Sequence, residues 1–390
     1  MKRFFTLSIS CLLILIRPAY AQRIIGDSLD ISLLTCSPGN ELYSAFGHSA
    51  IRVQDRLNEV DVVFNYGTFD FEQEGFYINF VRGKLMYFLD LDAYTSFYNQ
   101  YLAEGREIRE LGLLLTATEK ENILKFLLWN SRRENKFYAY DFFWDNCSTR
   151  VRDVFSNELK NKLKWHTEGW DSSHTLRENL KPYVQHLPWV SFGFDLILGL
   201  PCEQLASPMD QTFLPDRLEK LVRTASIEEA GLKTSWVTRD IILLKKNIVP
   251  ETTSIFSPLF TTTALLFFLS LLTLLEWQRK ITFALLSHGI IGISGVLGVF
   301  FVLMGFTDHF STPYNLNILW LLPSNLMFVF LPNHLKWKKH YLLGCILLTS
   351  AILISFPVFP QQMNLAFIPL MLMLINRYVM TYKNLSREIH

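Results

Sequence analysis

The sequence has no excess of charge of either sign. Its 37 Lys and Arg residues are balanced by 36 Asp and Glu residues, so that the formal net charge is +1. Proteins that bind nucleic acids concentrate Lys and Arg on one surface. The composition shows no such footprint, and we expect no nucleic-acid partner.

The sequence also lacks the short motifs that hold common cofactors. His and Cys residues do not recur at the spacing of metal ligands, and no glycine-rich phosphate-binding loop is present. Internal repeats and low-complexity tracts are absent as well. We therefore expect a protein that needs neither a metal nor a nucleotide cofactor.

Charged residues are scarce after about residue 255. Hydrophobic residues make up 50% of the chain and charged residues 19%, and the apolar excess is concentrated in five runs in this part. The runs are 257–275, 282–304, 316–332, 341–357 and 363–380. A helix needs about 20 apolar residues to cross a bilayer, so the first two runs are clear spans, whereas the last three are shorter or contain Pro. We expect an all-α bundle of about five transmembrane helices over 257–380.

Lys and Arg are missing from two of the four loops between these runs. They follow the first, third and fifth runs instead, at Arg279, Lys280, Lys336, Lys338, Lys339, Arg377, Lys383 and Arg387. Positive residues mark the cytoplasmic side of a membrane protein, which predicts five spans and a cytoplasmic tail at 381–390. The same topology places Asp308 and His309 on the side of the N-terminal domain, either as part of a substrate-binding site or as an ordinary solvated loop.

The first 21 residues have the pattern of a secretory signal peptide. Lys2 and Arg3 precede an apolar stretch over 4–16, and Ala19-Tyr20-Ala21 is a small-x-small cleavage site. The alternative is an uncleaved anchor helix. We expect cleavage before Gln22, export of a domain over 22–250, and a linker at 251–256 before the membrane domain.

Cysteine is rare, with five residues in the whole chain. Three of them, Cys36, Cys147 and Cys202, lie in the domain that we expect to be exported, and Cys345 lies in a predicted span. Export leads to an oxidising compartment. Three is an odd number, so at least one of these thiols stays unpaired, and a Cys36–Cys202 disulfide that leaves Cys147 free is open.

The segment 140–153, YDFFWDNCSTRVRD, contains a helix start with a cysteine at its first turn. A polar cluster over 145–149 precedes Val151, Val154 and Phe155, which have helical spacing. Cys147 would then lie at the positive end of the helix dipole, which lowers the pKa of a thiol and favours the nucleophilic thiolate. The alternative is a small buried hydrophobic residue.

Two alternating runs predict a β-hairpin, over 48–53 and 60–71, with a polar turn between them. If Val53 lies opposite Val60, His48 lies opposite Asn65, and paired residues share one face of a sheet. A slip of one residue would replace Asn65. Cys147, His48 and Asn65 would then form a Cys–His–Asn site of the papain type, in which the imidazole activates the thiol and the amide orients the ring. An ordinary core or surface histidine is the alternative.

Other segments predict further elements of a mixed α+β domain. We expect strands over 30–35 and 108–115, a helix over 118–129 with a capping box from Thr118 to Glu121, a helix over 175–181 ended by Pro182, and a helix over 217–223. The apolar segment 187–202 is too short and too broken for a span, so it is either core or an element on the membrane surface. The aromatic residues over 76–101 either build core, which we favour, or line a groove for an acyl chain.

The sequence resembles the Lnb family in several separated motifs that occur in the same order. The motifs are CSPGNELYSAFGHSAIRV (36–53), FNYGTFDF (64–71), YDFFWDNCSTRVRD (140–153), PWVSFGFDLILGLP (188–201) and, in the membrane region, TDHFSTPYNLN (307–317). The resemblance implies a permuted papain-like fold, distantly similar to lecithin retinol acyltransferase and the NlpC-type peptidases. It also implies N-acylation of bacterial lipoproteins, with Cys147 and His48 as the catalytic pair.

The activity implied by the resemblance is acyl transfer at the bacterial inner membrane, with the catalytic domain in the periplasm. A membrane phospholipid donates the acyl chain to Cys147, and a diacylated lipoprotein accepts it. We expect backbone N–H groups near Cys147, helped by Asn146 or Ser148, to hold the oxyanion. Arg52 and Arg150 either bind lipid phosphate or form structural ion pairs. The rival interpretations are a membrane-anchored cell-wall amidase or endopeptidase and a non-catalytic membrane scaffold.

Overall fold

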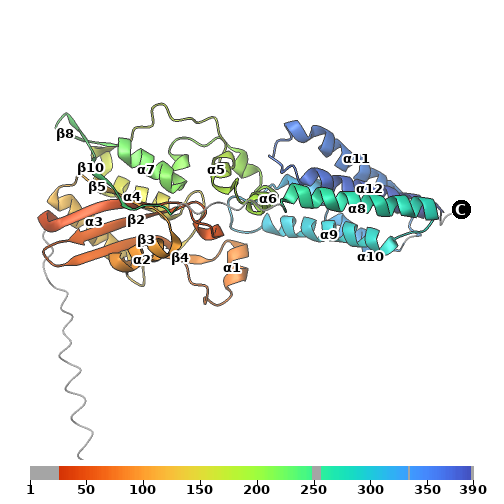
Figure 1. The fold of residues 1–390 in the computed structure, drawn as a ribbon, viewed down its shortest axis with the longest axis horizontal. Helices are drawn as coiled ribbons and strands as arrows, with labels where there is room; N and C mark the ends of the chain where they lie inside the picture. The colour runs from red at the N-terminus through yellow and green to blue at the C-terminus, as the bar shows by residue number, and fades with distance from the viewer. Residues whose placement is uncertain (1–25, 248–255, 333, 388–390) are drawn as a thin grey trace, which may run out of the picture.

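The structure is a computed structural model that describes residues 26–247, 256–332 and 334–387. The predicted signal peptide at 1–21 and most of the predicted linker at 251–256 lie outside these residues. Figure 1 shows two parts arranged end to end, a mixed domain of strands and helices and a bundle of helices that leads away from it. The expected α+β domain followed by a helical region is therefore confirmed.

An antiparallel sheet of seven strands forms the centre of the N-terminal domain, in the order β10-β5-β1-β2-β3-β4-β6. The strands are β1 (Leu29–Cys36), β2 (His48–Asp55), β3 (Val60–Thr68), β4 (Met86–Ala93), β5 (Ile108–Leu113), β6 (Phe137–Ala139) and β10 (Val237–Leu244). A small second sheet contains β7 (Leu163–Lys164), β8 (Ser226–Glu229) and β9 (Leu232–Ser235). The predicted strands at 30–35, 48–53, 60–71 and 108–115 all belong to the large sheet.

The described part of the N-terminal domain contains seven α-helices. They are α1 (Phe76–Arg82), α2 (Tyr94–Glu104), α3 (Ala117–Asn130), α4 (Cys147–Leu159), α5 (Lys181–Val184), α6 (Pro188–Ile197) and α7 (Pro215–Thr224). Of these, α2, α3, α4 and α7 pack against the strands of the large sheet. Successive side chains of a strand point to opposite faces, so a sheet with two apolar faces needs cover on both. The helices provide this cover.

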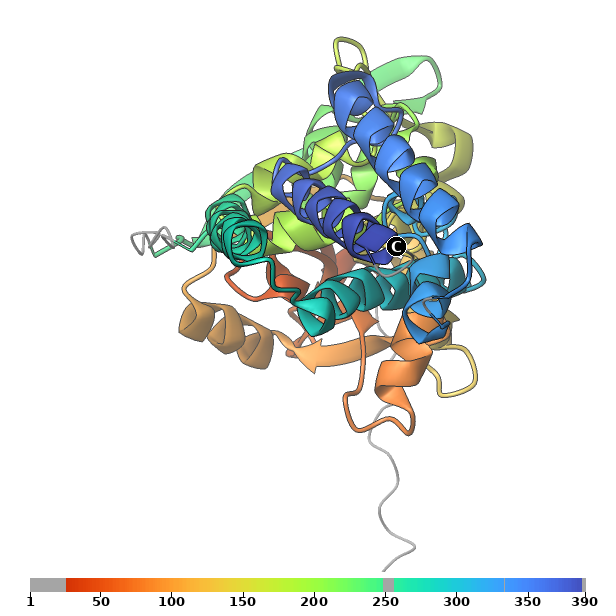
Figure 2. The same ribbon diagram turned by 90° about the vertical axis from the view of Figure 1, so that its right-hand side faces the viewer.

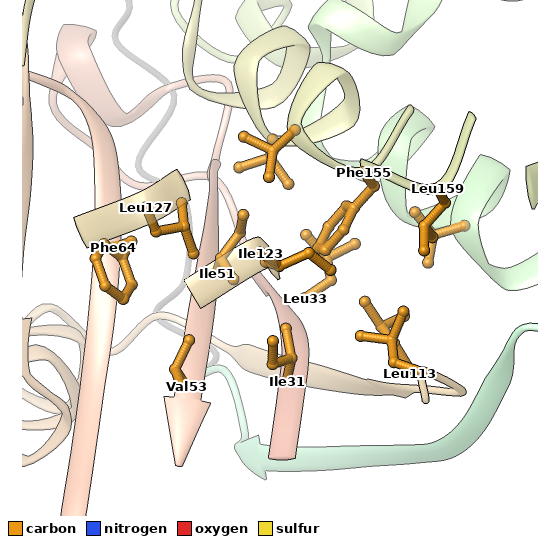
Figure 3. Packing of buried hydrophobic residues seen from close by; sticks show 14 of the residues in the cluster. Ile31, Leu33, Ile51, Val53, Phe64, Leu113, Ile123, Leu127, Phe155 and Leu159 are labelled. Atoms are coloured by element: carbon orange, nitrogen blue, oxygen red, sulfur yellow. The ribbon is translucent and has the colours of Figure 1, made fainter. Parts of the chain in front are cut away.

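Helices α3 and α4 pack against one face of the sheet, and their contact forms the main core of the domain. Figure 3 shows strand residues such as Ile31, Ile51 and Phe64 facing Leu127 of α3 and Phe155 of α4. Helix α2 covers the opposite face, where its aromatic residues meet Leu34, Ala50 and Val63 in a second buried cluster. Residues 50 and 51 thus enter different cores, as the alternation of the strand requires.

Some element boundaries differ from the sequence predictions. Helix α3 begins one residue before the predicted start at 118, and its capping box is shifted by two residues, since it joins Thr116 to Glu119 rather than Thr118 to Glu121. The segment over 175–181 is a 3-10 turn followed by the short helix α5, and Pro182 lies inside the first turn of α5, where no backbone donor is required. The aromatic region over 76–101 contains α1, β4 and α2, which the sequence analysis did not predict.

The C-terminal part contains five helices among the described residues. They are α8 (Pro258–Arg279), α9 (Ala284–Met304), α10 (Ser324–Phe330), α11 (Trp337–Ser355) and α12 (Phe367–Arg387). Three helical segments are long and apolar enough to cross a membrane, at Pro258–Arg279, Ala284–Met304 and Trp337–Val358. The expected third span at 316–332 is instead a 3-10 turn and the seven-residue α10, separated near Pro323. Proline at this point lacks the N–H that a continuous helix would need.

Helix α12 lies at the centre of the helical part, against α8, α9 and α11 (Figure 2). A fully buried ion pair fastens it to α8, with 2.9 Å between Arg377 Nη1 and Glu276 Oε2. A charge in an apolar interior is costly unless it is paired. This pair therefore explains how two charged residues are tolerated between apolar helices.

The two parts of the molecule are joined through helix α6 in the segment 187–202. Phe192 of α6 packs against the core of the helical part, and Phe194 packs against a core of the N-terminal domain. Asn317 Nδ2 donates to the carbonyl oxygen of Asp195 at 3.1 Å, and Asn364 Nδ2 donates to the Asp195 carboxylate at 2.9 Å. The segment is therefore a junction between the two parts, with polar bonds that hold the N-terminal domain at one end of the bundle.

Candidate active site

The N-terminus of α4 is built by the capping residue Asn146. Its Oδ1 accepts hydrogen bonds from the backbone N–H groups of Ser148 at 2.9 Å and Thr149 at 3.0 Å, and its Nδ2 donates to the carbonyls of Phe142 and Phe213, each at 2.8 Å. These bonds satisfy donors that a helix start leaves unpaired. They also place Cys147 as the first residue of the helix, as the sequence predicted.

His48 is the first residue of β2 and contacts Asn65 of β3. The observed register pairs Val53 with Val62 rather than Val60, so the predicted pairing was wrong by two residues. A shift of two residues keeps every side chain on its face. His48 and Asn65 are therefore diagonal neighbours instead of direct partners, and 3.2 Å separates His48 Nε2 from Asn65 Oδ1.

Asp92 of β4 extends this row and sets the direction of the Asn65 amide. Asn65 Nδ2 donates to Asp92 Oδ2 at 2.7 Å, so Oδ1 of the same amide faces the His48 ring. An amide oxygen can only accept. His48 Nε2 must therefore carry a proton, which leaves Nδ1 of the neutral ring free to act as a base.

The imidazole of His48 lies near the thiol of Cys147 and is the strongest influence that lowers the pKa of that thiol. Burial alone would raise the pKa of Cys147, but the nearby imidazole, the backbone N–H of Ser49 and the Ser148 hydroxyl outweigh it and lower that pKa. At Cys36 and Cys202 burial outweighs the neighbours that lower the pKa, chiefly Arg106 and Arg177, and it raises the pKa of each thiol to about 12. Among the cysteines of the N-terminal domain, Cys147 alone thus has an environment that favours a thiolate.

Gly67 provides the close approach between β3 and the helix start. Its φ of 89° is in the left-handed region, and a Cβ at this position would lie 3.5 Å from Cys147 Cβ and 3.9 Å from the Tyr140 ring. Cys147 and Tyr140 therefore both lie beside the backbone of Gly67. Burial raises the pKa of Tyr140 well above its ordinary value, so its hydroxyl stays protonated and can donate.

The sequence did not reveal Asp92, Ser49 or Tyr140 as parts of this site. Asp92 lies on β4, a strand that the sequence analysis did not identify. Ser49 was visible only as an alternating residue of β2, yet its hydroxyl lies 2.9 Å from the Ser148 hydroxyl and ties β2 to α4. Tyr140 is the first residue of the motif at 140–153, and this position in the motif could have identified it as a candidate site residue.

The structure corrects the expected oxyanion roles of Asn146 and Ser148. The Asn146 side chain is buried, and its amide group already makes the four bonds of the cap. Ser148 is also buried, its N–H donates to Asn146, and its hydroxyl contacts Ser49. These side chains hold the helix start in place, and in the described bonding of the cap the N–H of Cys147 has no acceptor.

Arg52 and Arg150 form structural ion pairs rather than an open phosphate site. Arg52 is buried, binds Asp61 at 2.6 Å and Glu110 at 3.1 Å, and stacks on the ring of Tyr94. This agrees with the alternative that the sequence left open for Arg52.

Arg150 is paired in the same way. Its guanidinium group makes two hydrogen bonds to Asp145, at 2.6 and 2.7 Å, and lies over the ring of Tyr138. A bidentate carboxylate partner of this kind occupies guanidinium N–H groups that could otherwise bind a phosphate. The interpretation of Arg150 as a structural residue is therefore the one that fits.

Asp308 and His309 contact α1 and the turn after it, not the Cys147 site. Asp308 N–H donates to the Arg82 carbonyl at 2.9 Å, and His309 Nε2 lies 2.8 Å from the Phe80 carbonyl oxygen. The Asp308 carboxylate is also 3.7 Å from Lys84 Nζ. Both residues connect the two parts of the molecule, a role that neither of the interpretations left open by the sequence had included.

The described cysteines, Cys36, Cys147, Cys202 and Cys345, are all free, so the open Cys36–Cys202 disulfide is not formed. Cys36 lies in the core beneath α2, whereas Cys202 lies in the core beside α6. Within the described ranges, no three His, Cys, Asp or Glu residues lie close enough to hold a metal ion.

Two family models match the chain. The model of the Lnb N-terminal periplasmic domain matches residues 17–181, and the model of the Lnb transmembrane domain matches residues 250–388. The chain belongs to the Lnb family. This Lnb protein is accordingly a membrane protein with an N-terminal periplasmic part. Searches of curated proteins and of solved structures found no match.

Proposed function

We propose that this Lnb protein is a lipoprotein N-acyltransferase of the bacterial inner membrane. It moves an acyl chain from a phospholipid to the N-terminal amine of a diacylglyceryl-cysteine lipoprotein, through a thioester on Cys147. The observation that carries the proposal is a row of neighbouring side chains in which His48 lies near Cys147 and hydrogen bonds join His48 to Asn65 and Asn65 to Asp92. The adjacent membrane domain supports lipids as substrates, because both substrates are anchored in a bilayer.

The first half-reaction transfers the acyl group to the enzyme. His48 Nδ1 accepts the thiol proton, and the Cys147 thiolate attacks the ester carbonyl of the phospholipid. The tetrahedral intermediate collapses as the bond to the glycerol oxygen breaks. The imidazolium returns its proton to that oxygen, which releases a lyso-phospholipid and leaves the thioester.

Two donors border the place where the oxyanion would form. One is the backbone N–H of Cys147 at the helix start, and the other is the hydroxyl of Tyr140, which shares the surroundings of Gly67. Donors fixed by a folded backbone stabilise a developing negative charge without reorganisation. We assign the oxyanion role to these two groups in place of the side chains of Asn146 and Ser148.

The second half-reaction passes the acyl group to the lipoprotein. The neutral α-amine attacks the thioester, His48 takes up the proton lost by the nitrogen, and an amide forms as the Cys147 sulfur leaves. The imidazolium then protonates the thiolate or remains paired with it. Thioesters react readily with amines, so this intermediate suits the formation of an amide.

The proposal includes the arrangement of the chain in the membrane. We propose that residues 22–250 lie in the periplasm and that the tail at 381–390 is cytoplasmic. The helical part then crosses the membrane five times, and the third crossing is made by the broken segment of a 3-10 turn and α10 rather than by one continuous helix. The absence of Lys and Arg from the 305–315 and 358–362 loops supports this topology. Fusions of reporter enzymes after α8, α9 and α11 would test it, because each reporter is active on one side only.

Mass spectrometry of lipoprotein N-terminal peptides tests the activity. We compare cells that lack the gene with cells that carry the wild-type chain, Cys147→Ala, His48→Ala or the matched control Cys202→Ala. The third acyl chain should be present with the wild type and with Cys202→Ala. It should be absent without the gene and in the Cys147→Ala and His48→Ala strains, although both substituted proteins are present at normal abundance.

Other results would favour the rival functions. A cell-wall amidase or endopeptidase would leave the lipoproteins unchanged and alter the muropeptides in the Cys147→Ala strain. A scaffold would be indifferent to both catalytic substitutions. Either result would contradict the proposed acyl transfer.

A further inference from the structure

An exposed apolar segment leads from the candidate active site toward the membrane domain. We call residues 69–82 the aromatic segment. It contains α1, and its apolar side chains are turned outward, with exposed fractions of 65% for Phe71, 78% for Tyr77 and 66% for Ile78. Contiguous apolar exposure of this kind marks a surface that meets a lipid or another protein.

The aromatic segment is held at the end of a candidate membrane span. Helix α9 ends at Met304, and the loop after it bonds to Phe80 and Arg82 through His309 and Asp308. Gly83 allows this approach, because a Cβ there would lie only 2.8 Å from the backbone nitrogen of His309. Figure 1 shows α1 at the end of the sheet domain that is nearer the helices. The segment therefore lies at the level where a spanning helix leaves the apolar part of a bilayer.

A row of aromatic rings continues from this segment to Cys147. Ring centroids are 6.4 Å apart for Phe80 and Phe76, 6.0 Å for Phe76 and Phe69, and 5.3 Å for Phe69 and Tyr87. The row continues to Tyr140.

Tyr87 stacks on Tyr140 at 4.2 Å, and Tyr140 borders Gly67 together with Cys147. An apolar surface thus connects the membrane level with the nucleophile. The segment also contains the charged residues Asp70, Glu72, Glu74 and Arg82, which are not part of this row of rings.

We propose that the aromatic segment enters the apolar surface of the periplasmic leaflet, and that the row of rings guides one acyl chain of a membrane phospholipid to Cys147. The occupant is a lipid rather than a peptide, because the segment stands beside a spanning helix and offers rings in place of unpaired backbone groups. Bilayer contact by the segment is independent of the proposed acyl transfer. Guidance of the acyl chain rests on that proposed function.

The first experiment locates the segment in a bilayer without using activity. Ile78→Cys and Leu232→Cys are made in the full chain with Cys147→Ser, labelled with an environment-sensitive nitrobenzoxadiazole dye, and placed in vesicles of phosphatidylethanolamine and phosphatidylglycerol. Leu232 is a matched control, because it is 73% exposed and belongs to the β8–β9 hairpin, which Figure 1 shows at the far end from the helices. The other cysteines that the structure describes, Cys36, Cys202 and Cys345, are buried.

Spin-labelled lipids should quench the dye at residue 78 and leave the dye at residue 232 unaffected. The emission from residue 78 should also shift to the blue, as in an apolar medium. A water-like, unquenched dye at residue 78 would overturn bilayer contact. Equal quenching at both positions would do so as well, since it would reflect general adsorption of the domain.

The second experiment tests guidance of the acyl chain. Phe71→Ser, Tyr77→Ser and Phe80→Ser are combined, and Leu57→Ser with Leu232→Ser provides a control of equally exposed side chains. Formation of the thioester is measured with a long-chain phospholipid in vesicles and with p-nitrophenyl butyrate in solution. Each methylene group that loses its apolar contact lowers the rate about fourfold.

The triple variant should react at least about tenfold more slowly with the phospholipid and normally with the soluble ester. Equal rates for the variant and the wild type with the phospholipid would overturn the guiding role. An equal loss with both esters would also overturn it, because it would reflect damage to the catalytic site.

Failure of the proposed function would look different from failure of the inference. In that case the wild type would form no thioester with either ester, which removes acyl guidance. The dyes at residues 78 and 232 would still decide whether the aromatic segment contacts the bilayer.

Discussion

Asp92 offers the sharpest test of the row of side chains that begins at Cys147. In Asp92→Ala the amide of Asn65 loses the acceptor that fixes its direction. The amide can then rotate and present its NH₂ group to His48 Nε2. That reversal favours the tautomer with a proton on Nδ1, which can no longer accept the Cys147 proton.

The size of the effect follows from the bond that is removed. A hydrogen bond to a charged group contributes about 1.5–3 kcal/mol, and about 1.4 kcal/mol corresponds to a factor of ten in rate. We therefore expect Asp92→Ala to lower kcat by about tenfold to about a hundredfold. Asp92→Asn should retain more activity, because its amide oxygen can still accept from Asn65.

The matched control is Asp90→Ala, which removes a carboxylate two residues earlier on the same strand. Thioester formation is measured with a soluble ester, and folding is checked by circular dichroism. The reasoning fails if Asp92→Ala and Asp90→Ala behave alike, or if Asp92→Ala weakens substrate binding without lowering kcat.

Three further predictions concern other groups of the site. His48→Ala should slow alkylation of Cys147 by iodoacetamide near neutral pH, because the pKa of the thiol rises once the imidazole no longer offsets its burial. The difference from the wild type should vanish at high pH, where the thiol is deprotonated in both proteins, and parallel pH profiles would contradict the pairing. Tyr140→Phe should lower kcat by about tenfold to a hundredfold at unchanged KM, as expected for an oxyanion donor, and an unchanged kcat would remove that role. Asn146→Ala should destabilise the domain by at least about 2 kcal/mol, since it removes a cap and leaves the buried carbonyl of Phe213 unpaired. Thermal unfolding in detergent measures this loss against Asn99→Ala, a change at an exposed residue of α2, and equal stability of the two variants would show that the cap is unimportant.

Local features of the site were readable from the sequence. The polar cluster before Val151 predicted the helix start at Cys147, because a cap and helical periodicity depend on residues within one or two turns. The alternation of β2 and β3 placed His48 and Asn65 on one face even though the register was wrong by two residues. A register shift of two residues leaves every side chain on the same face of the sheet. The shared face therefore depended only on the alternation along each strand, which neighbouring residues determine.

Features that depend on distant partners could not be read in this way. Asp92 reaches Asn65 only because β4 pairs with β3, and the sequence of β4 gave no clear alternation. The role of Arg52 depends on Glu110, which lies on another strand and far away in the chain. Asp308 and His309 were candidates for a substrate-binding site because they are polar residues at a membrane edge. Their contacts with Phe80 and Arg82 of α1, which is far away in the chain, could not be predicted from the sequence.

The sequence by itself determined the division into a mixed domain and an apolar helical part, the helix start at Cys147 and the shared face of His48 and Asn65. These follow from periodicity, capping and composition, which act over a few residues. Only the tertiary structure decided that Asp92 orients Asn65, that Asn146 is used up as a cap, and that the aromatic segment is fastened beside α9. These depend on burial and on hydrogen bonds between segments far apart in the chain, and such contacts exist only after the whole domain has packed.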